Sequence, residues 1–304
     1  MTATDNANLV TPMSDTPITT EAARLTGQPR YDPQENLEYW PLSAQTSQRQ
    51  IEEWSQDEDN SDLYRQSPED RRKFLDYKSR HLGWAQSEYY FQKLGIPIRG
   101  KVLEQGAGCF WLSSYLSSFN DVDEIIGVEL SKDRIVAFRD LALDLFPASN
   151  ASKIRYVVGD MHQLHVPDGS IDIVTCDAVL HHADNLVAVL RECWRVLKPG
   201  GWFIALREPT ISTLRLKPPQ FHSRYPEDGT AMYYYVDGWK SAFLNGWFQN
   251  IKVQHFMEYG LIRGRPVPWI ARRVLRALDA RIPLRFYPKV CIAAQKPLHN
   301  LQGS

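Results

Sequence analysis

The sequence has little of three features that would narrow its class at once: an excess of one charge, a long apolar run and paired cysteines. Its 35 basic residues nearly balance its 36 acidic ones, so the formal net charge is −1 and nothing global favours nucleic acid as a partner. No stretch reaches the ~18 apolar residues of a membrane span. The four cysteines form no Cys-x-x-Cys pair and are expected to be buried, reduced thiols, and no residue is proposed as a metal ligand.

The first 60 residues contain few apolar clusters. They are rich in Thr, Ser, Asp, Gln and Pro, so residues 1–60 are expected to form a mostly flexible arm. Residues 1–5 lack the basic and apolar regions of a signal peptide, and a cytoplasmic location is therefore expected. Four aromatic residues are unusual for such an arm and suggest that part of it lies across the main domain: Tyr31, Tyr39, Trp40 and Trp54.

Residues 61–300 are predicted to form one α/β domain with its core at 100–256. A serine, a proline and two acids at Ser67–Asp70 mark the start of an N-terminal helical extension. From Lys101 onward, short β-like runs alternate with segments of helical period, which predicts a doubly wound, mostly parallel, Rossmann-like sheet of seven strands with helices on both faces. The expected strands are 101–105, 124–129, 154–159, 171–176, 202–207, 251–256 and 290–295, and the main helices are near 111–119, 132–145, 186–197 and 236–248.

A glycine turn at the end of the first core strand is the strongest local signal. Residues 102–108 read as a strand that enters a Gly-x-Gly turn, where a ligand can approach the backbone closely. Glu129 lies about 20 residues later, where an acid can bind ribose hydroxyls. The glycine turn and this acid fit either a dinucleotide or an adenosyl ligand. A dinucleotide fingerprint needs a third small residue, and that position holds Trp111. Glu104 would also repel a pyrophosphate, whereas it suits the positive amino group of S-adenosylmethionine.

From about Lys101 to Phe256 the chain resembles the class I S-adenosylmethionine-dependent methyltransferases. The motifs occur in order and at normal spacing, with Cys109-Phe110 where the family usually has a third small residue. They are Val102-Leu103-Glu104-Gln105-Gly106-Ala107-Gly108, Gly127-Val128-Glu129-Leu130-Ser131, Gly159-Asp160-Met161, Ile171-Asp172-Ile173-Val174, Val179-Leu180-His181-His182, Arg195-Val196-Leu197-Lys198-Pro199-Gly200-Gly201, and Trp239-x-x-x-Phe243-Leu244 before Trp247-Phe248.

The resemblance implies S-adenosylmethionine as the cofactor and gives a role to each matching residue. The implied cofactor-binding residues are Glu104, Gly106 and Gly108 beside the methionine part, Glu129 at the ribose hydroxyls, Leu130 and Met161 on the adenine ring, Asp160 at the adenine amino group, and Asp177 near the sulfonium. For Asp160, a plain role as a turn former is the main alternative.

The predicted chemistry depends on the residues directly after the fourth and fifth core strands. Methyl transfer is an in-line displacement, so it needs alignment and, where the acceptor carries a proton, a base. His181 and His182 come after the fourth strand and Glu208 comes after the fifth, so their side chains should face one crevice. Similar methyltransferases that act on sugars and natural products use a histidine and an acid in these loops, which makes His181 with Glu208 the predicted catalytic pair and His182 a further candidate. The alternative is that these residues only pack.

Two segments outside the core bear on the acceptor. The predicted lid at about 208–235 contains His222 and the aromatic run Tyr233–Tyr235, which favours a ring-bearing substrate. The predicted basic helical insertion at about 260–289 interleaves seven arginines with apolar residues between 263 and 285. That pattern suits contact with a membrane or an acidic carrier protein, and a helix packed on the sheet with a solvated arginine face explains it equally.

The sequence therefore predicts transfer of a methyl group to a hydroxyl or amine of a small metabolite in secondary metabolism. The alternatives are C-methylation of a quinone or lipid at a membrane surface, and cofactor binding without transfer. Nucleic-acid methylation is disfavoured by the balanced charge and because Asp177-Ala178-Val179-Leu180 does not match the Asn/Asp-Pro-Pro-aromatic tetrad. The oligomeric state is not predicted.

Overall fold

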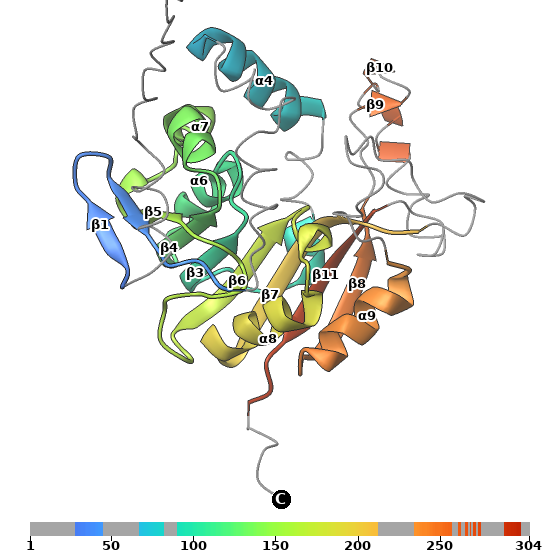
Figure 1. Cartoon of the computed structure of the whole chain (residues 1–304). Helices are drawn as coiled ribbons and strands as arrows, with labels where there is room; N and C mark the ends of the chain where they lie inside the picture. The colour runs from blue at the N-terminus through green and yellow to red at the C-terminus, as the bar shows by residue number, and fades with distance from the viewer. Residues whose placement is uncertain are drawn as a thin grey trace, which may run out of the picture.

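The computed structural model describes residues 28–44, 67–81, 90–211 and 234–256, together with 261–262, 265–266, 268, 270–271, 273–274 and 289–298. Among these residues, none of the helices has the length and hydrophobicity of a membrane span. The described elements form a nine-stranded sheet flanked by helices, and a separate two-stranded ribbon (Figure 1).

The sheet has the strand order β1-β2-β5-β4-β3-β6-β7-β11-β8. Neighbours from β2 to β7 pair in parallel, and β11 runs antiparallel to both β7 and β8, so the predicted mostly parallel, doubly wound sheet is confirmed. The chain moves outward from β3 and returns to β6 on the other side of β3, so the strand order reverses between β3 and β6. The core strands are β3 Gly100–Gln105, β4 Val122–Glu129, β5 Ile154–Val158, β6 Ile171–Asp177, β7 Leu197–Pro209, β8 Gln249–His255 and β11 Lys289–Gln295.

The sheet has nine strands rather than the predicted seven because the arm adds two. Strand β1 (Arg30–Asp32) pairs antiparallel with β2 (Leu37–Tyr39), and β2 extends the sheet beside β5. Tyr39 and Trp40 are buried in the domain, as the aromatic residues of the arm suggested, whereas Tyr31 is 60% exposed. Trp54 and the other arm residues outside 28–44 are not among the described residues.

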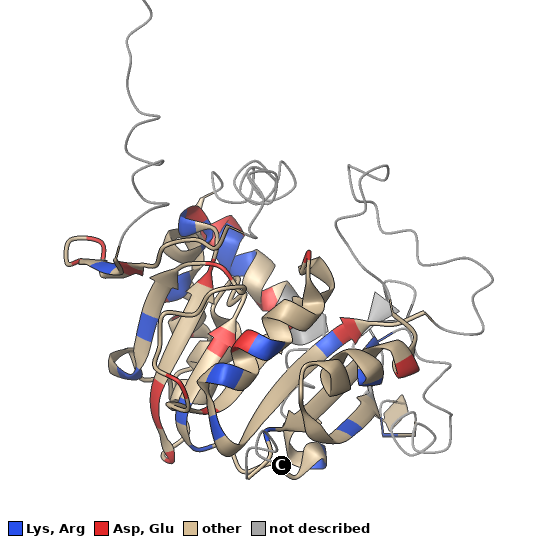
Figure 2. Cartoon of the chain, turned by 60° about the horizontal axis from the view of Figure 1, so that its bottom comes forward, with Lys and Arg blue, Asp and Glu red and all other residues tan. Residues whose placement is uncertain are grey.

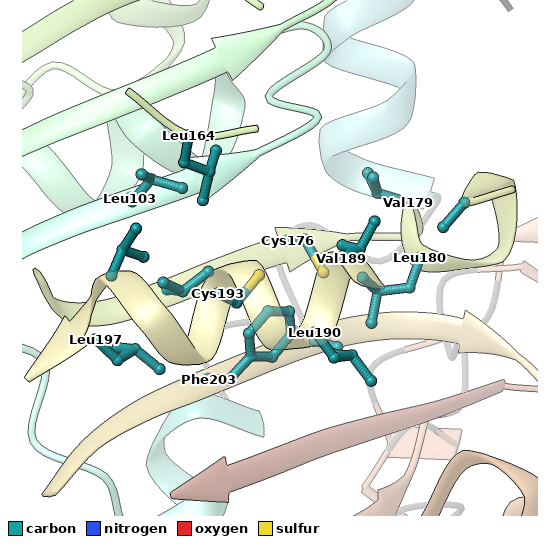
Figure 3. Close-up of a cluster of buried hydrophobic side chains, with 14 of the residues drawn as sticks. Leu103, Leu164, Cys176, Val179, Leu180, Val189, Leu190, Cys193, Leu197 and Phe203 are labelled. Atoms are coloured by element: carbon teal, nitrogen blue, oxygen red, sulfur yellow. The ribbon is translucent and has the colours of Figure 1, made fainter. Parts of the chain in front are cut away.

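Helices cover both faces of the sheet, as predicted, and each face has its own apolar core. Helices α4 (Pro68–His81), α6 (Trp111–Ser117) and α7 (Lys132–Leu145) belong to one core, and α8 (Leu186–Val196) and α9 (Val236–Asn245) belong to the other (Figure 1). Ser67 Oγ accepts the Asp70 N–H, which confirms the predicted cap of the first helix. Figure 3 shows the inner side of α8, where Val189, Leu190 and Cys193 pack toward the sheet.

Strand β7 begins earlier than predicted. The Lys198-Pro199-Gly200-Gly201 segment, expected to be a turn between a helix and a strand, belongs to β7. The strand tolerates it because Gly200 takes a φ of +80° and the pairing with β6 is irregular between Ile171 and Ile173.

The two segments expected to bear on the acceptor are described only in part. The described ends of the predicted lid meet, since the Ile211 N–H donates to the Tyr234 carbonyl at 3.0 Å; His222 and Tyr233 lie outside the described residues. The insertion predicted to be helical begins with an antiparallel ribbon, β9 (Leu261–Ile262) and β10 (Arg265–Pro266), and its described residues 270–271 and 273–274 are helical. Figure 2 shows basic and acidic residues interspersed over the described elements.

Candidate functional site

The glycine turn lies after β3, at the edge where the strand order reverses. Gly106 has a φ of +57°, and a Cβ placed there would lie 2.6 Å from Val179 Cγ1, so this position excludes a side chain for two reasons. Gly108 has a φ of +55°, but a Cβ there would meet nothing closer than a carbonyl oxygen at 3.8 Å. The turn therefore presents bare backbone beside open space at the end of β3.

Glu129 ends β4 and binds the glycine turn. Its Oε2 accepts the Gly108 N–H at 2.8 Å and its Oε1 accepts the Ser131 N–H at 3.0 Å. The carboxylate is 5% exposed and is thereby held between the turn and the start of α7. This is the place that the sequence assigns to ribose hydroxyls, and the neighbouring Leu130 is half-buried, as a side chain covering an adenine ring would be.

Asp160 lies just after β5 and is bound by the arm. Its Oδ1 accepts the His162 N–H at 2.6 Å, and its Oδ2 accepts the Ser43 N–H at 2.7 Å. Trp40 fixes the arm beside the end of β5, because its backbone N–H donates to the Val158 carbonyl and its side chain packs on Gly159. The carbonyl of the half-buried Met161 accepts from the Gln105 side chain. The arm is therefore part of the wall at the predicted adenine position, a contact 117 residues apart in sequence.

Glu104 is buried within β3 and accepts a hydrogen bond from the Ser113 hydroxyl of α6. Burial is the main cause that raises the pKa of Glu104 to about 8, the Ser113 bond opposes the rise, and the negative charges of Asp177 and Glu129 add to it. Glu104 thus holds the helix that comes after the glycine turn. Two further carboxylates, Asp177 and Glu129, therefore lie near Glu104, which is itself protonated at neutral pH.

Asp177 ends β6 and is engaged by two side chains. Its Oδ1 accepts from Arg207 Nε at 2.6 Å, and its Oδ2 accepts from Arg207 Nη2 at 2.5 Å and from Trp111 Nε1 at 2.8 Å. Arg207 has a positive φ of 55°, which is uncommon for a residue with a Cβ. Trp111, which occupies the position of a third glycine, therefore closes the turn against β6. The sequence missed Arg207 altogether, because a salt bridge between adjacent strand ends carries no motif.

His181 and Glu208 form a buried pair across the ends of β6 and β7. His181 Nδ1 lies 3.0 Å from Glu208 Oε2, and Glu208 Oε1 accepts the N–H groups of Val179 and Leu180 at 2.9 and 3.0 Å. Glu208 is fully buried, and His181 is 5% exposed. A carboxylate held by two backbone donors fixes the imidazole tautomer with Nδ1–H toward Glu208, which makes Nε2 the basic nitrogen. The predicted proximity of the two side chains is thus observed.

His182 lies directly against His181, with ring centroids 4.0 Å apart. Burial, followed by the positive charges of His181 and Arg134, holds the pKa of His182 well below its usual value. His182 is therefore a neutral ring at neutral pH, suited to packing beside the pair.

The described residues fit the cofactor that the family resemblance implies. Bare backbone at Gly106 and Gly108 would admit the methionine part, while Glu129 and Asp160 are acceptors for ribose hydroxyls and an adenine amino group. The carboxylates of Glu129 and Asp177 lie close enough to Glu104 to help raise its pKa, and negative charge at this edge disfavours a pyrophosphate. This arrangement supports the choice of an adenosyl sulfonium over a dinucleotide.

Comparison with known proteins agrees with this assignment. Residues 103–205 match the profile of the family described as "Methyltransferase domain". An uncharacterized methyltransferase of Bacillus subtilis, YcgJ, is 32% identical over 104 residues, which are 34% of this chain and 39% of that protein. A ubiquinone biosynthesis O-methyltransferase of Xanthomonas oryzae pv. oryzae is 28% identical over 158 residues, which are 51% of this chain and 62% of that protein. The match thus spans less than two thirds of either relative.

Solved structures share the fold at low sequence identity. A methyltransferase of Haloferax volcanii in complex with the activator Trm112 is similar with a TM-score of 0.54 and 16% identity, covering 75% of this chain and 94% of that one. A phosphoethanolamine N-methyltransferase of Haemonchus contortus, bound to S-adenosylhomocysteine, gives a TM-score of 0.55 and 16% identity over 83% of this chain and 61% of that one. These likenesses concern the fold alone.

Proposed function

We propose that this chain, which belongs to the class I S-adenosylmethionine-dependent methyltransferase family through the domain at residues 103–205, transfers a methyl group to a hydroxyl or amine of a small, ring-bearing metabolite. The observation that carries the proposal is the buried His181–Glu208 pair at the strand ends next to the glycine turn. A hydroxyl or ammonium acceptor must lose a proton, and this pair supplies a base where the acceptor would lie.

The chain's own residues have three tasks in this reaction. S-adenosylmethionine supplies an electrophilic methyl group on a sulfonium. The glycine turn, Glu129 and Asp160 would hold the cofactor. His181 Nε2 would accept the proton that the acceptor oxygen or nitrogen loses when it takes the methyl group, with S-adenosylhomocysteine as the other product.

Glu208 supports this proton transfer without touching the acceptor. Its Oε2 faces Nδ1 of His181, so the imidazolium that forms is stabilised by a negative charge at 3.0 Å. Its Oε1 is fixed by the N–H groups of Val179 and Leu180, so the carboxylate cannot rotate away. We therefore assign Glu208 as a positioning residue and His181 as the base.

A direct test is methyl transfer from radiolabelled S-adenosylmethionine to a panel of phenols, catechols, quinols, sugars, aryl amines and alkyl amines, with products identified by mass spectrometry. We expect oxygen or nitrogen methylation of ring-bearing members and strongly reduced transfer in His181→Ala. Transfer only to carbon would contradict the acceptor class. Tight S-adenosylhomocysteine binding without transfer to any member would favour a protein that binds the cofactor and does not use it.

A second candidate is a quinone or quinol acceptor at a membrane surface. The similarity to a ubiquinone biosynthesis O-methyltransferase favours a phenolic hydroxyl of this kind. Flotation with anionic liposomes tests the membrane contact proposed for the basic segment at 263–285, and an absence of binding at low salt would remove it. We also propose that the protein is cytoplasmic. Its reaction is proposed to belong to secondary metabolism.

A further inference from the structure

The outer side of α8 carries a cavity away from the glycine turn. The inner side of the helix packs toward the sheet (Figure 3), and of the residues around this cavity Trp194 packs against the edge of that core. The cavity has a volume of about 610 Å³. Its lining includes Trp194, Arg191 and Glu192 of α8, together with His162 from the loop after β5 and Trp247 from the end of α9.

Trp247 is held in a strained conformation at the mouth of this cavity. Its φ is +68°, a region that a bulky residue adopts only with backbone strain, and its side chain is nevertheless 44% exposed. The indole stands nearly perpendicular to Trp194, with ring centroids 5.5 Å apart and an interplanar angle of 78°. Gly246 allows this placement, because a Cβ there would lie 2.8 Å from Leu190 Cβ. Exposed aromatic area held at a strain cost points to a binding role.

Two buried polar groups at the cavity have no hydrogen-bond partner among the described residues. They are the indole N–H of Trp194 and the ring nitrogens of His162, whose Nδ1 lies 3.5 Å from Asp160 Oδ1 without hydrogen-bond geometry. The His162 side chain is 1% exposed, so bulk water does not satisfy it. A buried polar group without a hydrogen-bond partner destabilises the folded state, and each of the two therefore requires an explanation. A ligand that enters the cavity and displaces the side chains covering these groups supplies one.

The charge available at the cavity is positive. Glu192 is already neutralised by Arg195, which donates to both of its oxygens at 2.7 and 2.9 Å. Arg191 donates through Nε to the Asn245 carbonyl at 3.3 Å and stacks over Trp247 with its guanidinium carbon 4.5 Å from the ring centroid. Within the described part of the chain, its two terminal nitrogens have no acceptor. They are positioned for a carboxylate, which a guanidinium can bind through two parallel bonds.

We propose that this cavity, lined by Trp194, Trp247, Arg191 and His162, binds a planar organic anion, namely an aromatic or heteroaromatic carboxylate. The ring lies in the corner of the two indoles, the carboxylate pairs with Arg191, and an acceptor atom of the ligand takes the Trp194 N–H. None of the lining residues belongs to the glycine turn or to the His181–Glu208 pair, and neither Glu129 nor Asp160 lines the cavity, so the proposal does not rest on the proposed reaction.

The test is binding of naphthalene-2-carboxylate to the full chain, measured by saturation-transfer NMR in the presence of saturating S-adenosylhomocysteine. We expect the signal to persist with the cofactor product bound. Affinity should fall about tenfold or more in Arg191→Gln and in Trp247→Leu, because a charge-assisted hydrogen bond is lost in one and the ring contact in the other. The neutral carboxamide should bind as weakly to the wild type as the carboxylate binds to Arg191→Gln.

The matched control is Lys252→Gln, which removes a cation 5.0 Å from the Trp202 ring on another part of the sheet and should leave binding unchanged. Trp194→Phe keeps a ring and removes the unpartnered N–H, so the carboxylate should raise its melting temperature less than that of the wild type. Loss of the signal on adding S-adenosylhomocysteine would overturn the proposal. So would an absence of binding, or equal affinity in Arg191→Gln, Trp247→Leu and the wild type.

Discussion

His181 Nδ1 and Glu208 Oε2 lie 3.0 Å apart in a fully buried contact, and the other oxygen of Glu208 is held by two backbone N–H groups. This arrangement predicts a large effect of Glu208→Gln on the reaction. The amide oxygen can still accept the two backbone bonds, but its NH₂ group would face Nδ1 and drive the proton to Nε2. The base would then be lost, and we expect kcat to fall on the order of 10²- to 10⁴-fold while the affinity for S-adenosylhomocysteine is retained.

His181→Ala should lower kcat to a similar extent, and the double variant should be little worse than either single one, because the pair acts as a unit. Glu124→Gln serves as the control, since that carboxylate pairs with Lys101 and Arg155 away from the strand ends that form the site. Unchanged kcat in both Glu208→Gln and His181→Ala, measured with an acceptor found in the panel, would leave alignment alone as the mechanism.

The bond between the Ser43 N–H and Asp160 predicts that the arm sets the affinity for the cofactor. Ser43→Pro removes the donor, so the carboxylate loses one of its two backbone bonds and its fixed orientation. We expect the dissociation constant of S-adenosylhomocysteine, measured by calorimetry, to rise about five- to tenfold. Ser43→Ala keeps the N–H and should bind as the wild type does. Equal affinity in the two variants would show that the arm does not position Asp160.

The sequence predicted the sheet well because its evidence is local and periodic. Strand β4 and helix α7 were expected at 124–129 and 132–145, and the structure has them at Val122–Glu129 and Lys132–Leu145. The approach of His181 to Glu208 was also predictable, because His181 follows β6 and Glu208 lies near the end of β7, although the sequence placed it just after that strand. The ends of these parallel strands are at the same edge. The sequence pattern thus predicts which strands occur and at which edge of the sheet their ends lie.

Contacts that depend on side-chain packing between distant segments could not be predicted. The carboxylate of Asp177 was expected near the sulfonium, and the structure pairs it with Arg207 and Trp111, neither of which belongs to a motif of that kind. The two arm strands were missed because a strand of three residues, such as Leu37–Tyr39, is too short to show a periodic pattern. Its pairing with β5 joins segments that are far apart in the sequence. The extent of β7 was missed because Pro199 and Gly200 usually mark turns.

The buried carboxyl of Glu104 predicts a pH dependence of stability. Its pKa is about 8 in the folded chain and near 4.5 when exposed, so between those values the folded state holds a proton that the unfolded state has lost. The contribution of Glu104 to the free energy of unfolding is therefore fully present below about pH 4.5 and is lost as the pH rises toward 8. The loss is at most about 1.4 kcal/mol per pH unit.

Glu104→Gln mimics the protonated carboxyl and should remove this part of the slope in the unfolding free energy between about pH 5 and about pH 8, measured by urea denaturation. Glu124→Gln is the matched control in the neighbouring strand, because ion pairs with Lys101 and Arg155 lower its pKa and it is ionised throughout that range. An identical slope in Glu104→Gln and the wild type would contradict the assignment of a raised pKa to Glu104.

The contact between Gly106 and Val179 predicts different costs for two similar substitutions in the glycine turn. Gly106→Ala adds a Cβ 2.6 Å from Val179 Cγ1 at a positive φ, so both overpacking and backbone strain destabilise it, by about 3 kcal/mol in total. Gly108→Ala meets the same φ penalty without a clash and should cost about 1 kcal/mol. Adding Val179→Ala to Gly106→Ala should relieve the clash and leave the strain, which brings that double variant close to Gly108→Ala. Equal unfolding free energies for the two single variants in urea would show that Val179 does not restrict the turn.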